Sequence, residues 1–275
     1  MANARRMAPK TPKHVKVESL MIGDVPCEWL GPKSDRALMY LHGGGYVFGG
    51  LDSHRDLGWR LAEASGMRVL MVDYRLAPEN PFPAAIEDAS ECYRWLIEQG
   101  YAAEQLAIGG DSAGGGLTLA TLLNIKNLGM PMPHSAILLS PWCDLSMSGD
   151  SISLNAESDS MLAVGGLKKC AEAYLGDRDR RAPFASPLFG DLSGLPPMLI
   201  QVGSTEILLS DSRRLADKLK AAGSEAALEV WPNMPHVFQV FAARVPEGKQ
   251  AIRNLGEFLR GRASASAAGE AKSEE

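Results

Sequence analysis

Short runs of apolar residues alternate along this chain with longer stretches in which apolar residues recur at helical spacing. The apolar runs predict buried strands at 37–41, 68–74, 106–108, 135–140, 197–202 and 226–231. The helical spacing predicts helices at 53–64, 84–99, directly after Ser112, at 211–222 and at 248–259. Ser53 is the expected N-cap of the first of these helices. Such alternation indicates an α/β fold, with a mostly parallel central β-sheet flanked by helices.

The ends of the chain and one long insertion depart from this alternation. Strand-like segments at 14–20 and 25–30 precede it, and a Ser- and Asp-rich stretch from Cys143 to Phe189 interrupts it with one predicted helix near 167–175. An insertion of that length is typical of a lid or a binding loop. We therefore predict four segments: a catalytic domain at 14–261, its cap or lid at 150–185, a loose N-terminal segment at 1–13 and a disordered tail at 262–275.

Composition and charge argue against nucleic acid and membranes as binding partners of this chain. The net charge of -5 over 275 residues offers no electrostatic attraction to nucleic acid or to an anionic membrane. The basic N-terminus is not followed by an apolar run, so the sequence predicts no secretory signal, and the apolar runs are too short to span a bilayer. We expect a small-molecule substrate, no nucleic acid and no stable membrane association.

The four cysteines are widely spaced. Cys27, Cys92, Cys143 and Cys170 show no C-x-x-C spacing, which favours reduced and mostly buried thiols over a zinc site or a disulfide framework. The predicted location is cytoplasmic.

A glycine-flanked serine lies between a predicted strand and a predicted helix. Gly110-Asp-Ser-Ala-Gly114 matches G-x-S-x-G, which is typical of a sharp strand-to-helix turn that exposes a nucleophilic serine hydroxyl, here Ser112. Glycines at both flanks tolerate backbone angles and close contacts that other residues do not. The motif alone also matches an ordinary glycine-rich turn, so a catalytic role of Ser112 requires further residues elsewhere in the chain.

A serine hydroxyl needs a base, and histidine is the usual one. His14 opens a predicted strand, His54 starts a predicted surface helix, and His134 precedes a strand, while His42 belongs to a glycine-rich loop. His236 follows the last predicted strand on a loop. A base that reaches over the edge of the sheet is expected at that place, so we predict His236 as the base.

The base needs a carboxylate that fixes its tautomer, and in this architecture the acid lies between the serine and the histidine in chain order. Glu206 lies on the loop directly after the predicted strand 197–202, whereas Asp211 lies where a helix N-cap is expected. We predict Glu206 as the acid and keep Asp211 as the alternative. Backbone N–H groups of Gly43, Gly44 and Ala113 are the predicted donors to the oxyanion.

Four motifs together resemble one family. His42-Gly-Gly-Gly45, Asp73-Tyr-Arg-Leu-Ala-Pro-Glu79, Gly110-Asp-Ser-Ala-Gly-Gly115 and Pro235-His236 are similar to those of the bacterial hormone-sensitive-lipase-like esterases. The resemblance implies an α/β-hydrolase fold and hydrolysis of short-chain acyl esters without a metal or an organic cofactor. It also implies a homodimer formed through the last edge strand.

Two departures from that family bear on the site. Glu206 stands where the family commonly has Asp, and only about thirteen residues precede the first strand where the family usually has cap helices. We read the first as a substitution and expect the second to leave a more open pocket. The predicted pocket residues are Tyr46, Phe48, Trp142, Leu145, Met161 and Val237.

The same triad serves other reactions. An amidase, a lactonase or a deacetylase would use the same three residues, and a ligand-binding protein on this fold, like the gibberellin receptors, would lack the base. His236 argues against the receptor alternative. We therefore predict a serine carboxylesterase.

Overall fold

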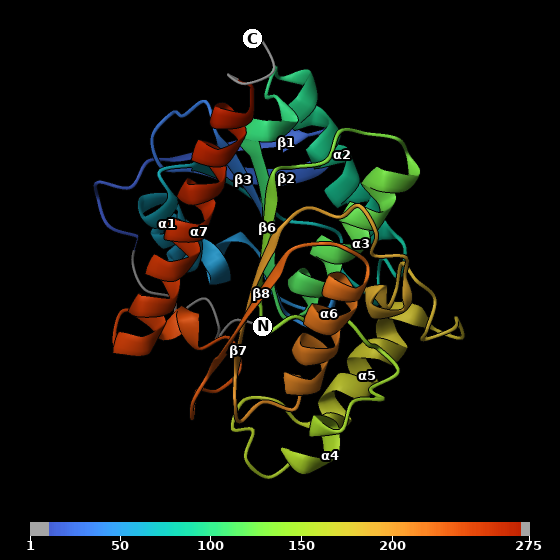
Figure 1. Ribbon diagram of the computed structural model, residues 1–275. Helices are drawn as coiled ribbons and strands as arrows, with labels where there is room; N and C mark the ends of the chain where they lie inside the picture. The colour runs from blue at the N-terminus through green and yellow to red at the C-terminus, as the bar shows by residue number, and fades with distance from the viewer. Residues whose placement is uncertain (1–10, 271–275) are drawn as a thin grey trace.

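The computed structural model describes residues 11–270, with side chains up to residue 261. Its centre is an eight-stranded sheet with the order β1-β2-β4-β3-β5-β6-β7-β8, in which β2 pairs antiparallel with β1 and β4 and all other pairs are parallel (Figure 1). The strands are β1 (Val17–Ile22), β2 (Val25–Leu30), β3 (Ala37–Leu41), β4 (Arg68–Val72), β5 (Leu106–Asp111), β6 (Ser135–Leu139), β7 (Met198–Gly203) and β8 (Ala226–Trp231). This arrangement confirms the predicted α/β-hydrolase fold class.

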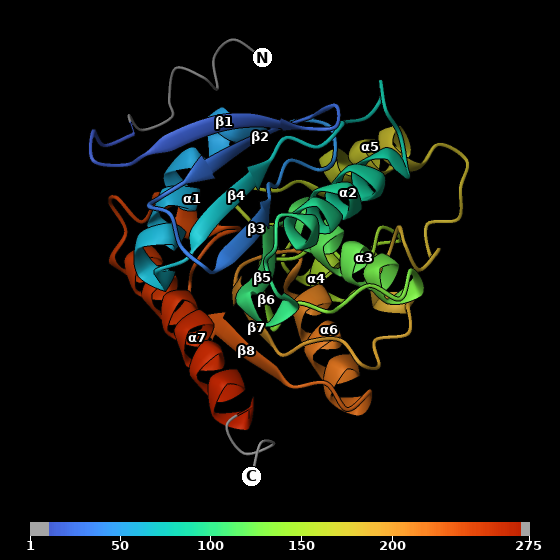
Figure 2. The same ribbon diagram turned by 90° about the horizontal axis from the view of Figure 1, so that it is seen from above.

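Helices connect the strands. They are α1 (Leu51–Ser65), α2 (Ala84–Glu98), α3 (Ala113–Asn127), α4 (Ser151–Leu154), α5 (Val164–Leu175), α6 (Leu209–Ala221) and α7 (Pro246–Glu270), with the short 3-10 helices η2 (Ala103–Gln105), η3 (Pro187–Phe189) and η4 (Phe238–Phe241). Figure 2 shows α1 and α7 on one face of the sheet and α2, α3 and α6 on the other.

The strands β2 to β7 contribute to two apolar layers. Leu38 and Tyr40 of β3 pack with α1 and α7, whereas Met39 and Leu41 pack in the larger layer with α2, α3 and α6. Successive side chains of a strand point to opposite faces, so a strand covered on both sides must be apolar throughout. This double burial is the reason that continuous apolar runs predicted the strands.

The predicted N-cap of the first helix and the predicted end of the last helix are wrong. The first helix begins at Leu51 with Gly50 as its N-cap, and the Ser53 hydroxyl donates to the Gly50 carbonyl at 2.9 Å without capping the helix. α7 continues to Glu270, into the part predicted to be disordered. Alanine and glutamate favour helix, and extending an existing helix needs no new nucleus. Residues 1–10 and 271–275 of the predicted loose ends lie outside the described residues.

The insertion after β6 contains two α-helices, α4 and α5, where the sequence predicted one. α5 lies against the loop that follows β3, because Tyr174 stacks on Tyr46 with ring centroids 3.9 Å apart. A Cβ placed on Gly45 would lie 2.8 Å from Cys170 Sγ of α5. The insertion is therefore packed directly on the glycine-rich loop.

Of the helices in residues 11–270, none has the length and apolar character that crossing a membrane requires. The parallel strands place their carboxyl ends at one edge of the sheet, where ligands bind in open α/β sheets. His42, Ser112, Glu206 and His236 all follow the carboxyl ends of strands.

Candidate active site

Ser112 occupies a strained turn between β5 and α3. Its backbone angles are φ 53° and ψ −121°, which a residue other than glycine rarely adopts. The Ser112 N–H donates to the Leu139 carbonyl at the end of β6, and the Ser112 carbonyl accepts the N–H groups of Gly115, Gly116 and Trp142. Strain of this kind persists only where the surrounding structure holds it, and it gathers at functional sites.

The glycines around Ser112 allow this turn to touch the end of β3. A Cβ on Gly114 would lie 2.0 Å from the Leu41 carbonyl oxygen and 2.5 Å from that of His42. A Cβ on Gly110 would lie 2.5 Å from the Leu41 carbonyl oxygen. Since these neighbours are backbone atoms, they cannot move aside.

We therefore expect Gly114→Ala to destabilise the protein by more than about 3 kcal/mol, measured as the free energy of unfolding in urea. The matched control is Gly166→Ala in α5, where a Cβ would meet nothing within 4 Å. That variant should gain about 0.5–1 kcal/mol, because alanine restricts the unfolded chain. Equal stability of the two variants would contradict the close packing of this turn.

Glu206 and His236 are in direct contact. His236 Nδ1 lies 2.7 Å from Glu206 Oε2, and the side chains are 7% and 0% exposed. Glu206 Oε1 accepts hydrogen bonds from the Gly203 N–H and from the Ser140 hydroxyl. A carboxylate at Nδ1 fixes the neutral imidazole with its proton on Nδ1, which leaves Nε2 free to accept a proton.

The loop that carries His236 is held on the end of β7. The Thr205 hydroxyl donates to the Met234 carbonyl at 2.9 Å, and a Cβ on Gly203 would lie 2.0 Å from the same oxygen. Val237, directly after the histidine, has φ 49° and ψ 44°, a region that β-branched residues rarely enter. The histidine therefore follows a closely packed segment.

Asp211 has a different role. Its Oδ2 accepts the backbone N–H groups of Cys143 and Asp144, each at 2.9 Å. Burial, together with the nearby Asp144 carboxylate, raises the pKa of Asp211 to about 7. Asp211 thus anchors the start of the insertion to α6, and the carboxylate that contacts His236 is Glu206.

The predicted oxyanion donors differ in their availability. Gly43 donates its N–H to Asp111 Oδ1 at 3.1 Å, which corrects the assignment of Gly43 as a free donor. No acceptor within residues 11–270 bonds the N–H of Gly44 or of Gly45. Ala113 is the first residue of α3, where an N–H has no partner within the helix. Gly44, Gly45 and Ala113 therefore present the available donors.

Comparison with known proteins identifies the family. The family model described as the alpha/beta hydrolase fold matches residues 38–240. An acetyl-hydrolase of Streptomyces hygroscopicus is 44% identical over 241 residues, covering 87% of this chain and 81% of that protein. An esterase of Acinetobacter venetianus is 38% identical over 256 residues, covering 92% of this chain and 84% of that protein.

Solved structures agree. The crystal structure of EstE5 superposes with a TM-score of 0.93 at 45% identity, covering 96% of this chain and 90% of that chain. An esterase from the bacterial hormone-sensitive lipase family has a TM-score of 0.93 at 47% identity, covering 94% and 89%. The chain belongs to the hormone-sensitive-lipase-like carboxylesterases of the α/β-hydrolase fold. It is a carboxylic ester hydrolase, as the resemblance predicted.

In this carboxylesterase, Asp111 and His54, which were not among the predicted site residues, support the glycine-rich loop at 42–45. Asp111 is buried and accepts the Tyr40 hydroxyl at 2.9 Å on Oδ1, while His54 Nε2 lies 3.3 Å from Oδ2. Burial alone would raise the pKa of Asp111, but His54, together with Tyr40 and His42, lowers it below the usual value of an aspartate. His54 is therefore part of the support of the site, and its prediction as a surface residue is wrong.

The buried imidazole of His42, beside His54, is neutral. Burial, reinforced by His54, lowers the pKa of His42 to about 4. Its ring stacks on Tyr74 with centroids 4.3 Å apart, and its Nδ1 donates to the Gly43 carbonyl at 2.8 Å. The imidazole thus stiffens the glycine loop without adding charge.

The predicted pocket residues separate into two groups. Tyr46, Trp142 and Leu145 are buried in the larger apolar layer, so they are core residues and not an open lining. Phe48 and Met161 are 60% and 50% exposed, and Val237 is nearly buried beside His236. Of the six predicted pocket residues, Phe48 and Met161 are therefore the two that a ligand arriving from solvent can reach.

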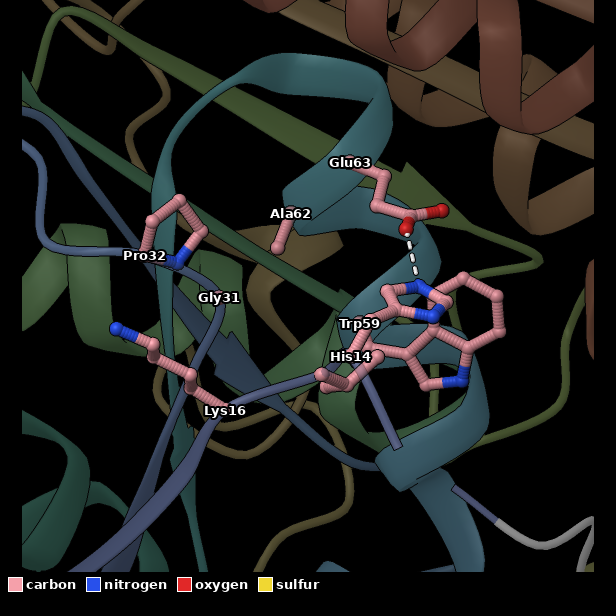
Figure 3. Close-up of a pocket in the computed structure, with 8 residues that line it drawn as sticks. His14, Lys16, Gly31, Pro32, Trp59, Ala62 and Glu63 are labelled. Carbon is pink, nitrogen blue, oxygen red and sulfur yellow. Dashed lines mark hydrogen bonds and ion pairs between the residues drawn. The ribbon is translucent and has the colours of Figure 1, made fainter. Parts of the chain in front are cut away.

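A groove of 210 Å³ lies elsewhere in the carboxylesterase, between α1 and the segments that precede β1 and follow β2 (Figure 3). In it His14 Nε2 lies 2.8 Å from Glu63 Oε1, and the His14 ring meets Trp59 edge to face. None of the residues that line it belongs to the predicted triad. Within the described residues no three His, Cys, Asp or Glu side chains are placed to hold a metal ion, and the four cysteines are free thiols.

Proposed function

We propose that this carboxylesterase hydrolyses short-chain acyl esters through a triad of Ser112, His236 and Glu206. The observation that carries the proposal is the buried contact of 2.7 Å between His236 Nδ1 and Glu206 Oε2, at the sheet edge where the Ser112 turn ends. A ligand-binding protein has no use for a base held by a buried carboxylate. A structure of the relative EstE5 was obtained after soaking with p-nitrophenyl butyrate, and another relative is an acetyl-hydrolase, which supports short acyl groups.

The reaction follows from these roles. Ser112 Oγ attacks the acyl carbon while His236 Nε2 takes the hydroxyl proton, and Glu206 stabilises the imidazolium that forms. Gly44, Gly45 and Ala113 donate N–H groups to the oxyanion. His236 then returns the proton to the leaving alcohol, and the acyl group stays on Ser112. Water attacks this acyl-enzyme with His236 again as base, which releases the acid and restores the serine.

The test is hydrolysis of a p-nitrophenyl ester series from acetate to dodecanoate, with a matched p-nitroanilide of the best acyl group. We expect kcat/KM to peak at four carbons or fewer and to fall by at least about tenfold at eight. Each methylene that the pocket cannot accommodate costs about 1–3 kcal/mol of transition-state binding. A higher kcat/KM on the anilide than on the ester would point to an amidase. A peak at long chains would contradict the short-acyl proposal.

The triad itself has a separate readout. A serine-directed fluorophosphonate should phosphonylate Ser112 with loss of fluoride, so that the peptide containing Ser112 gains the mass of the phosphonyl group. Ester hydrolysis should fall in proportion to this label. Label on another serine, with hydrolysis lost in proportion to it, would overturn the assignment of the nucleophile.

The homodimer implied by the resemblance stays a proposal. β8 pairs with β7 on one side, and no strand in residues 11–270 pairs with its other side. An unpaired edge of this kind is a template for pairing with a second chain. The cytoplasmic location also stays a prediction.

A further inference from the structure

The carboxyl end of β6 contributes a buried hydroxyl between the proposed acid and base. Ser140 is the first residue after β6, is 0% exposed, and has φ 47°. Its N–H donates to the Gln201 carbonyl of β7 at 2.7 Å. β6 lies between β5, which precedes Ser112, and β7, which precedes Glu206. Ser140 therefore stands at the centre of the site, although it carries none of the roles assigned so far.

The direction of its hydrogen bonds is fixed by chemistry. The Val237 N–H, one residue after His236, donates to Ser140 Oγ at 3.1 Å. Ser140 Oγ lies 2.7 Å from Glu206 Oε1, and an ionised carboxylate can only accept. The single hydroxyl proton therefore goes to Glu206, while the hydroxyl oxygen receives the N–H of the histidine loop.

We propose that Ser140 is a positioning residue of ester hydrolysis, which fixes the Glu206 carboxylate and the His236 loop relative to each other. The inference rests on the proposed function, in which these two residues are the acid and the base. A glutamate has one more torsion than an aspartate, so holding its carboxylate in one orientation costs more conformational entropy. The Ser140 hydroxyl and the Gly203 N–H both hold Oε1, which leaves Oε2 for His236.

The consequence is catalytic rather than merely structural. Without the hydroxyl, Glu206 Oε1 loses one of its two donors and the Val237 N–H loses its acceptor, so the imidazole can leave its productive position. A misplacement of about 1 Å in an active site can cost about a hundredfold in rate. Substrate binding does not use this hydroxyl, because Ser140 is 0% exposed.

The test uses two deletions of the hydroxyl and one control. We expect Ser140→Ala and Ser140→Gly each to lower kcat about 10- to 100-fold with KM changed less than about twofold. Glycine adopts a φ of 47° freely, whereas alanine does not, so the pair separates the hydroxyl from backbone strain. Full recovery of kcat in Ser140→Gly would overturn the proposal and leave Ser140 with a backbone role.

The control is Ser151→Ala. Ser151 is also nearly buried, and its hydroxyl donates to the Ile207 carbonyl at 2.6 Å and accepts the Ser210 N–H at 2.9 Å, without touching the Glu206 carboxylate. This variant should lose stability while keeping kcat. In NMR spectra, the low-field resonance of the proton between His236 and Glu206 should shift or broaden in both Ser140 variants and stay unchanged in Ser151→Ala. Unchanged resonances in the Ser140 variants would overturn the proposal.

A double variant separates this inference from the proposed function. Because Ser140 acts through the contact between Glu206 and His236, Glu206→Gln with Ser140→Gly should be about as slow as Glu206→Gln alone. Independent losses that multiply would overturn the positioning role. If Glu206→Gln alone kept the wild-type rate, the acid assignment would fail first, whatever the Ser140 variants showed.

Discussion

Replacing Ser112 by alanine should lower kcat for p-nitrophenyl acetate by about 10⁴- to 10⁶-fold, because the acyl-enzyme cannot form without the hydroxyl. The residual rate would come from water attacking an ester that the oxyanion donors still hold. KM should change little, since the N–H groups of Gly44, Gly45 and Ala113 are backbone groups that the substitution leaves in place. Steady-state kinetics over a range of substrate concentrations separates the two constants.

The fold provides the control for this variant. The backbone angles of Ser112, φ 53° and ψ −121°, strain serine and alanine alike, because both carry a Cβ. The hydrogen bond from the Ser112 N–H to the Leu139 carbonyl joins backbone groups, so the substitution leaves it in place. The melting temperature should therefore stay within a few degrees of the wild-type value. A folded Ser112→Ala protein that keeps more than a tenth of the wild-type kcat would contradict the nucleophile assignment. The missing fluorophosphonate label in that protein gives an independent check.

The strands and the order of the proposed triad could be predicted from the sequence for physical reasons. β3 is buried along its whole length, so its apolar run coincides with the strand. The predicted limits 37–41 and 226–231 match those of β3 and β8. The Ser112 turn was predictable because its glycines serve backbone contacts that no other residue allows. Signals of this kind are local in the chain.

The supports of the site could not be predicted, since they depend on contacts between distant segments. His54 reaches Asp111 across 57 positions, and its place in the first turn of a helix reads as a surface position. The Gly43 N–H looked free in the motif, but it bonds Asp111 across 68 positions. Ser140 closes an apolar strand and has no polar pattern around it. Such residues show their roles only when the strand ends are brought together.

Replacing Glu206 by glutamine should lower kcat by about 10³- to 10⁴-fold, because it forces the wrong histidine tautomer. Glu206 Oε1 accepts from Gly203 and Ser140 while Oε2 faces His236 Nδ1. Glutamine has a single oxygen, which can occupy only one of the two positions held by Oε1 and Oε2. With that oxygen held by Gly203 and Ser140, its NH₂ group faces Nδ1, so the imidazole carries its proton on Nε2 and cannot accept one from Ser112. Glu206→Asp keeps the charge at a shorter reach and should lose less.

The matched control is Asp211→Asn, whose kcat should stay within about threefold of wild type, since an amide oxygen can accept the N–H groups of Cys143 and Asp144. Its effect should appear in stability. Because burial and Asp144 raise the pKa of Asp211 to about 7, the folded protein keeps a proton that the unfolded chain loses near pH 4.

The sign of the Asp211 effect follows from this proton. Where the folded state binds more protons than the unfolded state, the free energy of unfolding falls as pH rises, here between about pH 4 and 7. Asp211→Asn lacks this titration, so its stability relative to wild type should rise across that window, as urea unfolding at pH 5 and 8 would measure. A large loss of kcat in Asp211→Asn with little loss in Glu206→Gln would reverse the assignment of the acid. Because the hydrogen bond to His236 comes from Glu206, whereas Asp211 bonds Cys143 and Asp144, the opposite pattern is expected.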